Sequence, residues 1–189
     1  MISVFLSERP TEKTTKYLII SSFLLLVISM PIVIGLLTLS NSTGDVYAFQ
    51  LGFNAEYIRS VFSLMSNEEL SIFILGNLFD YVFMIAYGTL IFSSALLLTR
   101  KLREGSIWNQ IGFFIAIAGI IASCCDAMEN IFLLLMVSNP VNFPSWLAIP
   151  HSSFALVKFI ILYASMGWIF LTIVLIVLSG LIKRNQIKS

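Results

Sequence analysis

Residues 107–137 have the sequence IWNQIGFFIAIAGIIASCCDAMENIFLLLMV, and this stretch decides the fold. Most of its residues are apolar, but Asp126, Glu129 and Asn130 follow one another within about one helical turn. A helix needs about 20 apolar residues to cross a hydrocarbon core of about 30 Å. The stretch is therefore predicted to be a membrane-spanning helix that carries two carboxylates and an amide on adjoining faces.

The composition of the whole chain supports the same class of protein. Of its 189 residues, 58% are hydrophobic and 11% are charged, and the mean hydropathy is +0.96. A soluble domain carries about 25% charged residues. The formal net charge of +1 shows no basic excess, so no nucleic-acid partner is expected. We expect one integral membrane domain over residues 1–189.

Three further stretches are long and apolar enough to cross a bilayer. The four predicted spans cover approximately residues 16–39, 70–99, 107–137 and 153–182. No strand pattern is present between them. The predicted fold is an all-α polytopic membrane protein, a four-helix transmembrane bundle.

The distribution of basic residues between the spans predicts an orientation. The connection Arg100–Glu104 is short and basic, and so is the tail from Lys183 to Ser189. The loop at 41–69 contains only one cation, Arg59, and the loop at 138–152 contains no Lys or Arg. By the positive-inside rule, both termini and the 100–104 connection face the cytoplasm.

The first outer loop carries an apolar stripe at helical spacing. A stripe on an otherwise polar segment predicts a short interfacial helix, or a lid that caps the bundle. An irregular loop is the alternative. The stripe consists of Phe49, Phe53, Tyr57, Val61 and Met65, with Ile58 and Phe62 beside it.

Two spans show regular faces that predict contacts between helices. Small residues recur along the third span, and such residues allow a neighbouring backbone to approach closely. The fourth span carries polar residues at every seventh position, which predicts one face turned toward other spans. The small residues are Gly112, Ala116, Gly119 and Ser123, and the heptad is His151, Lys158, Ser165, Thr172 and Ser179.

Polar residues on three spans are predicted to meet in the outer half of the bundle. Continuing the small-residue stripe leads to Asp126 and Asn130, and Asp80 lies at a comparable depth on the second span. Ionisable residues inside a membrane are functional candidates, because burying them is costly. The acid/base candidates are Asp80, Asp126, Glu129 and Lys158, and the ligand-binding candidates are Asn77, Tyr87, Asn130 and His151.

Three functions fit such a cluster, and the sequence leaves open whether the chain is an enzyme. The acid–lysine pairs could serve only to fix helix packing in a structural subunit. They could instead supply an acid and a base for catalysis. Alternatively, an acid pocket could bind a cation or relay protons in an oligomeric transporter.

Among these functions we favour binding or processing of a lipid-like amphiphile, with lateral access between the spans. Helical rise places Asp126 roughly 16 Å and Glu129 roughly 12 Å from the outer end of their helix, within reach of a lipid's polar linkage. Membrane lipids are the expected partners, and a homo-oligomer or a larger membrane complex is an alternative. No cofactor is indicated, although a divalent cation at Asp80, Asp126, Glu129 and His151 fits the residue types.

Overall fold

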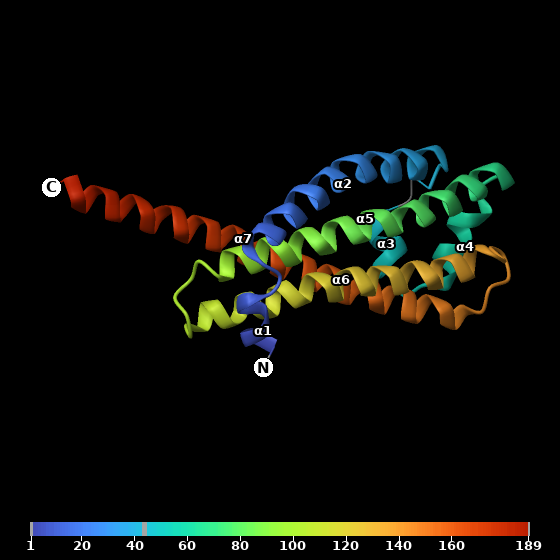
Figure 1. The fold of residues 1–189 in the computed structure, drawn as a ribbon. Coiled ribbons are helices and arrows are strands. Elements are labelled where there is room, and N and C mark those ends of the chain that lie inside the picture. Colours follow the sequence, from blue (N-terminus) through green and yellow to red (C-terminus); the bar gives the residue numbers. More distant parts are fainter. Residues whose placement is uncertain (1, 43–44, 189) are drawn as a thin grey trace.

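Four long helices form an elongated bundle (Figure 1). The computed structural model describes residues 2–42 and 45–188, with side chains for 4–42 and 45–180, so the basic tail at 183–188 lies outside the described side chains. The long helices are α2 (Glu12–Leu39), α5 (Asn67–Thr99), α6 (Ile107–Val137) and α7 (Ala148–Lys188). Their length and composition suit four membrane spans. The predicted all-α four-helix membrane architecture is confirmed.

Capping residues set where the first two long helices begin. Thr11 accepts a hydrogen bond from the Thr14 backbone N–H at 3.2 Å and opens α2. Ser66 and Glu69 form a capping box at the start of α5, in which each side chain accepts a hydrogen bond from the other residue's backbone N–H. Both helices therefore begin a few residues before the apolar stretches at 16 and 70 that mark the predicted spans.

The last span begins earlier than predicted. A 3₁₀ turn, η1 (Ser145–Leu147), leads directly into α7 at Ala148 rather than at Ser153. Pro150 lies within the first turn of α7, where its missing N–H would have no helical partner in any case. Pro150 is thus part of the helix, and His151 follows it in the same first turn and is buried.

The helices are arranged with α5 and α6 in the centre. The principal interfaces join α2 to α5, α5 to α6, and α6 to α7. In the most apolar part of each span, 50% of the residues of α5 and 39% of those of α6 are buried inside the bundle. The share is 17% for α2 and for the last span. A site formed by α5, α6 and α7 therefore lies inside the bundle. Helix α2 packs mainly against α5 and contributes little to the interior.

Close helix contacts occur where the sequence predicts them. A Cβ atom added at Gly112 would clash with the Thr99 hydroxyl and would lie 2.7 Å from the Trp168 ring. A Cβ atom at Gly119 would lie 2.6 Å from Ile91. The small-residue stripe of α6 thus allows α5 and α7 to approach, as predicted. The heptad face of α7 is buried at His151, Lys158, Ser165 and Thr172, whereas Ser179 is exposed.

The segment predicted as one interfacial helix consists of two short helices, α3 (Val46–Leu51) and α4 (Ala55–Ser63). The helical conformation is interrupted between them at Phe53, whose φ of 52° lies in the left-handed region. Asn54 then caps α4 by accepting hydrogen bonds from two backbone N–H groups. The prediction that residues from Phe49 to Met65 form one continuous apolar face is therefore wrong.

The break changes which side chains of the capping segment are buried. Ala55, Ile58 and Phe62 form the buried face of α4, whereas Phe53 is exposed. Arg59 holds α4 to the 138–147 connection by donating to the Phe143 carbonyl at 2.7 Å. The prediction of a cap on the bundle is therefore correct, although its register differs.

Apolar side chains form three layers along the bundle axis. The first layer lies under α4, at what we call the α4 end, and contains Phe62, Phe73 and Phe143. The middle layer contains Met84 and Ile91. The third layer lies at the opposite end, the α1 end, where the short helix α1 (Ile2–Glu8) inserts Leu6. The other buried members of this third layer are Ala95, Leu96, Phe113, Ala116 and Trp168.

Candidate functional site

A buried ion-pair cluster lies between the first and the middle apolar layers. Its centre is Lys158 of α7, which is 5% exposed. The Lys158 Nζ donates to Asp126 Oδ1 at 2.9 Å and lies 2.5 Å from Glu129 Oε2. Both acids belong to α6. They are three residues apart and therefore lie on adjoining faces of that helix, so both can reach the same ammonium group. Two carboxylates thus surround one ammonium group.

Glu129 is the most enclosed member of the cluster, with 0% exposure. Its Oε2 lies 2.5 Å from the Lys158 ammonium, whereas among the described residues its Oε1 has no hydrogen-bond partner. An acceptor without a donor in a low-dielectric interior is costly. Among the described side chains, Lys158 is therefore the partner that holds the Glu129 carboxylate.

Asp126 has a second partner on α5. The Tyr87 hydroxyl donates a hydrogen bond to Asp126 Oδ2 at 2.9 Å, while Oδ1 faces Lys158. Both oxygens of this carboxylate are thus satisfied by donors. Hydrogen bonds from a phenol and an ammonium favour the ionised form of a carboxylate. Asp126 is therefore the acid of the cluster with a hydrogen-bond donor at each carboxylate oxygen.

Asp80 belongs to a neighbouring branch of the cluster. Asn130 Nδ2 donates to Asp80 Oδ2 at 2.9 Å and lies 3.4 Å from the Asn77 carbonyl oxygen. Asn77 in turn donates to the Phe73 carbonyl at 2.8 Å. Asp80 is half-buried, and no described cation lies within ion-pair distance of it. It is thus an acid with an amide donor and no counter-charge in contact.

His151 contacts the cluster through backbone rather than through an acid. Its Nδ1 lies 3.4 Å from the carbonyl oxygen of Glu129, and its ring packs edge-on against Phe49 of α3. Within the described residues, Nε2 has no hydrogen-bond partner. His151 therefore positions the turn that carries Glu129 and is not in hydrogen-bond contact with a carboxylate.

The structure brings all eight predicted site residues into one region, and it adds residues that the sequence analysis missed. The Tyr81 hydroxyl donates to the Ala127 carbonyl at 3.3 Å and ties α5 to α6 beside Asp126. The Phe159 ring centroid lies 4.8 Å from Lys158 Nζ, in cation–π range. Both residues adjoin a predicted site residue in sequence, but an aromatic neighbour alone is too common a signal to identify them.

The cluster is packed, and its ion pairs are enclosed by the surrounding side chains. Asp126, Asn130 and Lys158 are at most 5% exposed. A cavity of about 70 Å³ adjoins the Asn77 branch under α3 and is lined by Phe49, Gln50 and Leu133 among others, but not by Lys158. Space for a ligand at the ion pairs would require movement of the side chains around them.

The cluster carries more negative than positive groups. Asp80, Asp126 and Glu129 face the single ammonium group of Lys158. In the described part of the chain, no three acid, histidine or cysteine side chains converge as they would to hold a metal ion. A divalent cation at this position stays a prediction.

No protein-family model, curated protein or solved structure matches this chain. Its function must therefore be inferred from its own residues.

Proposed function

We propose that this protein binds a membrane amphiphile beside the buried acid–lysine cluster and uses the acids as proton donor and acceptor toward the polar group of that ligand. The observation that carries the proposal is the unequal pairing of the acids. Lys158 contacts Asp126 and Glu129, whereas Asp80 has only an amide donor. Such inequality separates acids that stay ionised from an acid that exchanges a proton.

In this proposal the roles follow from the contacts. Lys158 and Tyr87 hold Asp126 as a fixed anion, so Asp126 supplies negative potential rather than a proton. Asp80 is half-buried and forms no ion pair with a described residue, and it exchanges a proton with the ligand. Asn130 orients the Asp80 carboxyl group through the 2.9 Å hydrogen bond. General acid–base catalysis needs such a positioned carboxyl group within reach of the reacting atom.

The apolar layers favour entry of a ligand from the side of the bundle. Phe62 and Phe143 close the α4 end, and Met84 and Ile91 close the opposite side. The 70 Å³ cavity under α3 is lined by residues of α2, α3 and α5 and includes Asn77. The buried Gln50 Oε1 has no hydrogen-bond partner among the described residues, so a polar ligand group there would supply one.

The proposed location is the outer half of the bilayer, with both termini in the cytoplasm. It rests on the basic residues of the Arg100–Glu104 connection. Single cysteines introduced into a background without Cys124 and Cys125 test it. We expect external labelling at Ser66→Cys and Ser138→Cys and none at Ser106→Cys in intact cells. Labelling at position 106 would contradict the orientation.

The decisive experiment identifies the lipids that copurify with the protein and compares two variants with the unaltered protein. Asp80→Asn should leave the thermal stability nearly unchanged while the copurifying amphiphile or its conversion is lost. Ser71→Ala, on the exposed side of α5, is the matched control and should retain both. Loss of folding without selective loss of ligand in Asp80→Asn would contradict the proposal, as would binding of small hydrophilic amines with no lipid present.

A structural role is the second candidate, because Lys158 contacts two carboxylates. The double exchange Asp126→Lys with Lys158→Asp distinguishes it. If the pair only braces helices, the exchange should restore both stability and ligand binding. If the acids serve the ligand, stability should return without binding, because the fixed negative charge has moved from α6 to α7.

A further inference from the structure

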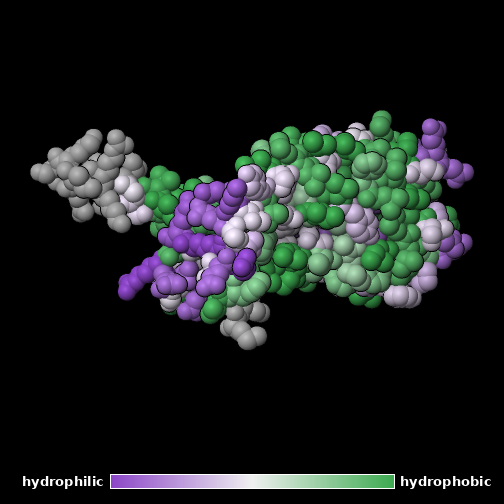
Figure 2. All heavy atoms as spheres, viewed as in Figure 1, coloured by the Kyte–Doolittle hydropathy of each residue, from purple (hydrophilic) through white to green (hydrophobic). Residues whose placement is uncertain are grey.

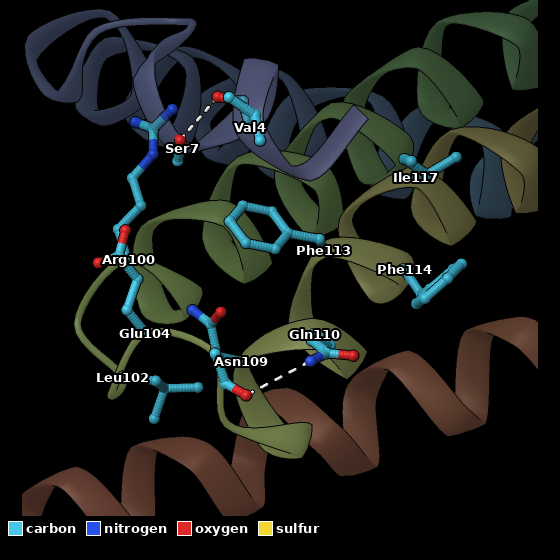
Figure 3. Close-up of a pocket in the computed structure, with 11 residues that line it drawn as sticks. Val4, Ser7, Arg100, Leu102, Glu104, Asn109, Gln110, Phe113, Phe114 and Ile117 are labelled. Atoms are coloured by element: carbon cyan, nitrogen blue, oxygen red, sulfur yellow. Dashed lines mark hydrogen bonds between the residues drawn. The ribbon is translucent and has the colours of Figure 1, made fainter. Parts of the chain in front are cut away.

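A second and larger cavity lies at the α1 end of the molecule, away from the acid cluster. It has a volume of about 950 Å³ and lies between α1, the connection after α5 and the first turns of α6 (Figure 3). Ligand sites have volumes of about 300–1,000 Å³. No residue of the acid cluster lines this cavity, so its role is independent of the proposed function.

The lining of this cavity is polar on one side and apolar on the other. Ser7, Arg100, Glu104 and Asn109 lie toward one side together with Leu102, and Phe114 and Ile117 lie toward the other (Figure 3). Along α6, Gln110, Phe113, Phe114 and Ile117 follow at helical spacing and extend over about 10 Å. Phe114 is 74% exposed. The cavity is thus open toward the apolar flank of the bundle.

Arg100 and Glu104 both line the polar side of the cavity, but the two side chains do not form an ion pair. The Arg100 guanidinium donates to the Leu6 carbonyl at 3.1 and 2.7 Å and to the Thr15 hydroxyl at 3.3 Å. No described carboxylate lies within ion-pair distance. Partial burial lowers the pKa of Arg100, and the charge of Glu12 opposes this shift. A guanidinium has five N–H donors, so it can bind an anion as well.

The position of the cavity matches the boundary between a membrane and water. Hydrophilic residues gather at the α1 end, directly beside the hydrophobic surface of the bundle (Figure 2). Exposed basic side chains lie at this end, namely Lys13, Lys16, Lys101 and Arg103. Basic residues at a membrane surface attract lipid phosphates. A ligand that has an anionic group for the Arg100 guanidinium and an apolar chain for Phe114 and Ile117 would match the two sides of the lining.

We propose that this cavity binds a membrane phospholipid, with its phosphodiester at Arg100 and one acyl chain along the Gln110–Ile117 face of α6. Arg100 suits a phosphodiester because a planar guanidinium can donate two parallel hydrogen bonds to phosphate oxygens. The exposed Phe114 lets the acyl chain pass from the cavity into the bilayer. The bound lipid would fill the space between α1 and α6 and help to hold α1 in place.

The test is native mass spectrometry of the full-length, delipidated protein, titrated with dioleoyl phosphatidylglycerol, dioleoylglycerol or oleate. The phospholipid should bind at least about tenfold more tightly than the other two, because only it has a phosphodiester. Equal binding of dioleoylglycerol or oleate would overturn the proposal.

Two variants locate the site. Ile117→Trp fills the apolar part of the cavity and should abolish phospholipid binding. Val157→Trp introduces the same side chain at an exposed position of α7 that does not line the cavity. This control variant should bind the phospholipid as tightly as the unaltered protein does. Unchanged binding in Ile117→Trp would contradict the location.

Arg100→Gln tests the polar end of the site. It should weaken phosphatidylglycerol binding about tenfold and leave dioleoylglycerol binding unchanged, because only the phosphate needs the guanidinium. The variant also removes the contact to Leu6. An equal loss of both lipids would therefore show that Arg100 acts through α1, and it would contradict the assigned phosphate contact.

Discussion

Lys158 and Arg100 are two cations within the same bundle, and their surroundings differ in kind. Lys158 is enclosed and lies against two carboxylates. Arg100 is half-buried, and its hydrogen bonds to the described residues go to a backbone carbonyl and a hydroxyl, beside a cavity of about 950 Å³. A cation with internal counter-charges stabilises a closed interior, whereas a cation with neutral partners retains attraction for an external anion. The difference separates a packed polar core from an open binding site.

The largest effect is expected from Lys158→Met. Removal of the ammonium leaves Asp126 and Glu129 buried without a counter-charge, which costs about 3–5 kcal/mol in similar pairs. The free energy of unfolding, measured in mixed micelles of SDS and a mild detergent, checks this value. Adding Asp126→Asn and Glu129→Gln to Lys158→Met should recover much of the loss. No recovery in the triple variant would show that packing of the lysine stem, rather than charge, is responsible.

Arg100→Gln should be less destabilising, at about 2 kcal/mol, because it removes charge-assisted hydrogen bonds without leaving an unpaired carboxylate. The loss should be concentrated at α1, which Arg100 holds through the Leu6 carbonyl. Faster hydrogen exchange in α1 with little change in α6 would confirm it. A uniform increase over all helices would contradict the distinction between Arg100 and Lys158.

Tyr87→Phe should cost about 1 kcal/mol, because it removes one hydrogen bond to Asp126 and keeps the ring in place. Tyr81→Phe is the matched control on the same helix, where the hydroxyl donates to a carbonyl at 3.3 Å and is less buried. The unfolding free energies of the two variants should therefore differ, with Tyr87→Phe lower. Equal values would show that the phenol does not stabilise the Asp126 anion.

The smallest effect is expected from Glu129→Gln, below about 1 kcal/mol. The cluster has an excess of carboxylates, and Lys158 keeps Asp126 as a hydrogen-bonded partner. Asp126→Asn should cost more, since it weakens contacts with both Lys158 and Tyr87. Measuring both variants under the same unfolding conditions decides the order, and a larger loss in Glu129→Gln would reverse the assigned importance of the two acids.

The sequence by itself determined the four spans and the polar residues that share one region of the bundle, whereas the orientation stays a prediction. The physical reason is that hydrocarbon tolerates long apolar helices and penalises unpaired charges, so length and polarity are visible in the chain alone. The span at 107–137 has the predicted bounds. The small residues of α6 and the heptad of α7 likewise predict buried faces, because helical periodicity is a local property.

Only the tertiary structure decided which partners meet. Asp126 and Lys158 are 32 residues apart, and their contact depends on the rotation and depth of two helices, which periodicity does not specify. The same holds for His151, which contacts the Glu129 backbone rather than an acid. The left-handed Phe53 divides the predicted cap, and α1 folds back to form the second cavity with Arg100. These features arise from packing between segments distant in sequence, and therefore from the assembled bundle alone.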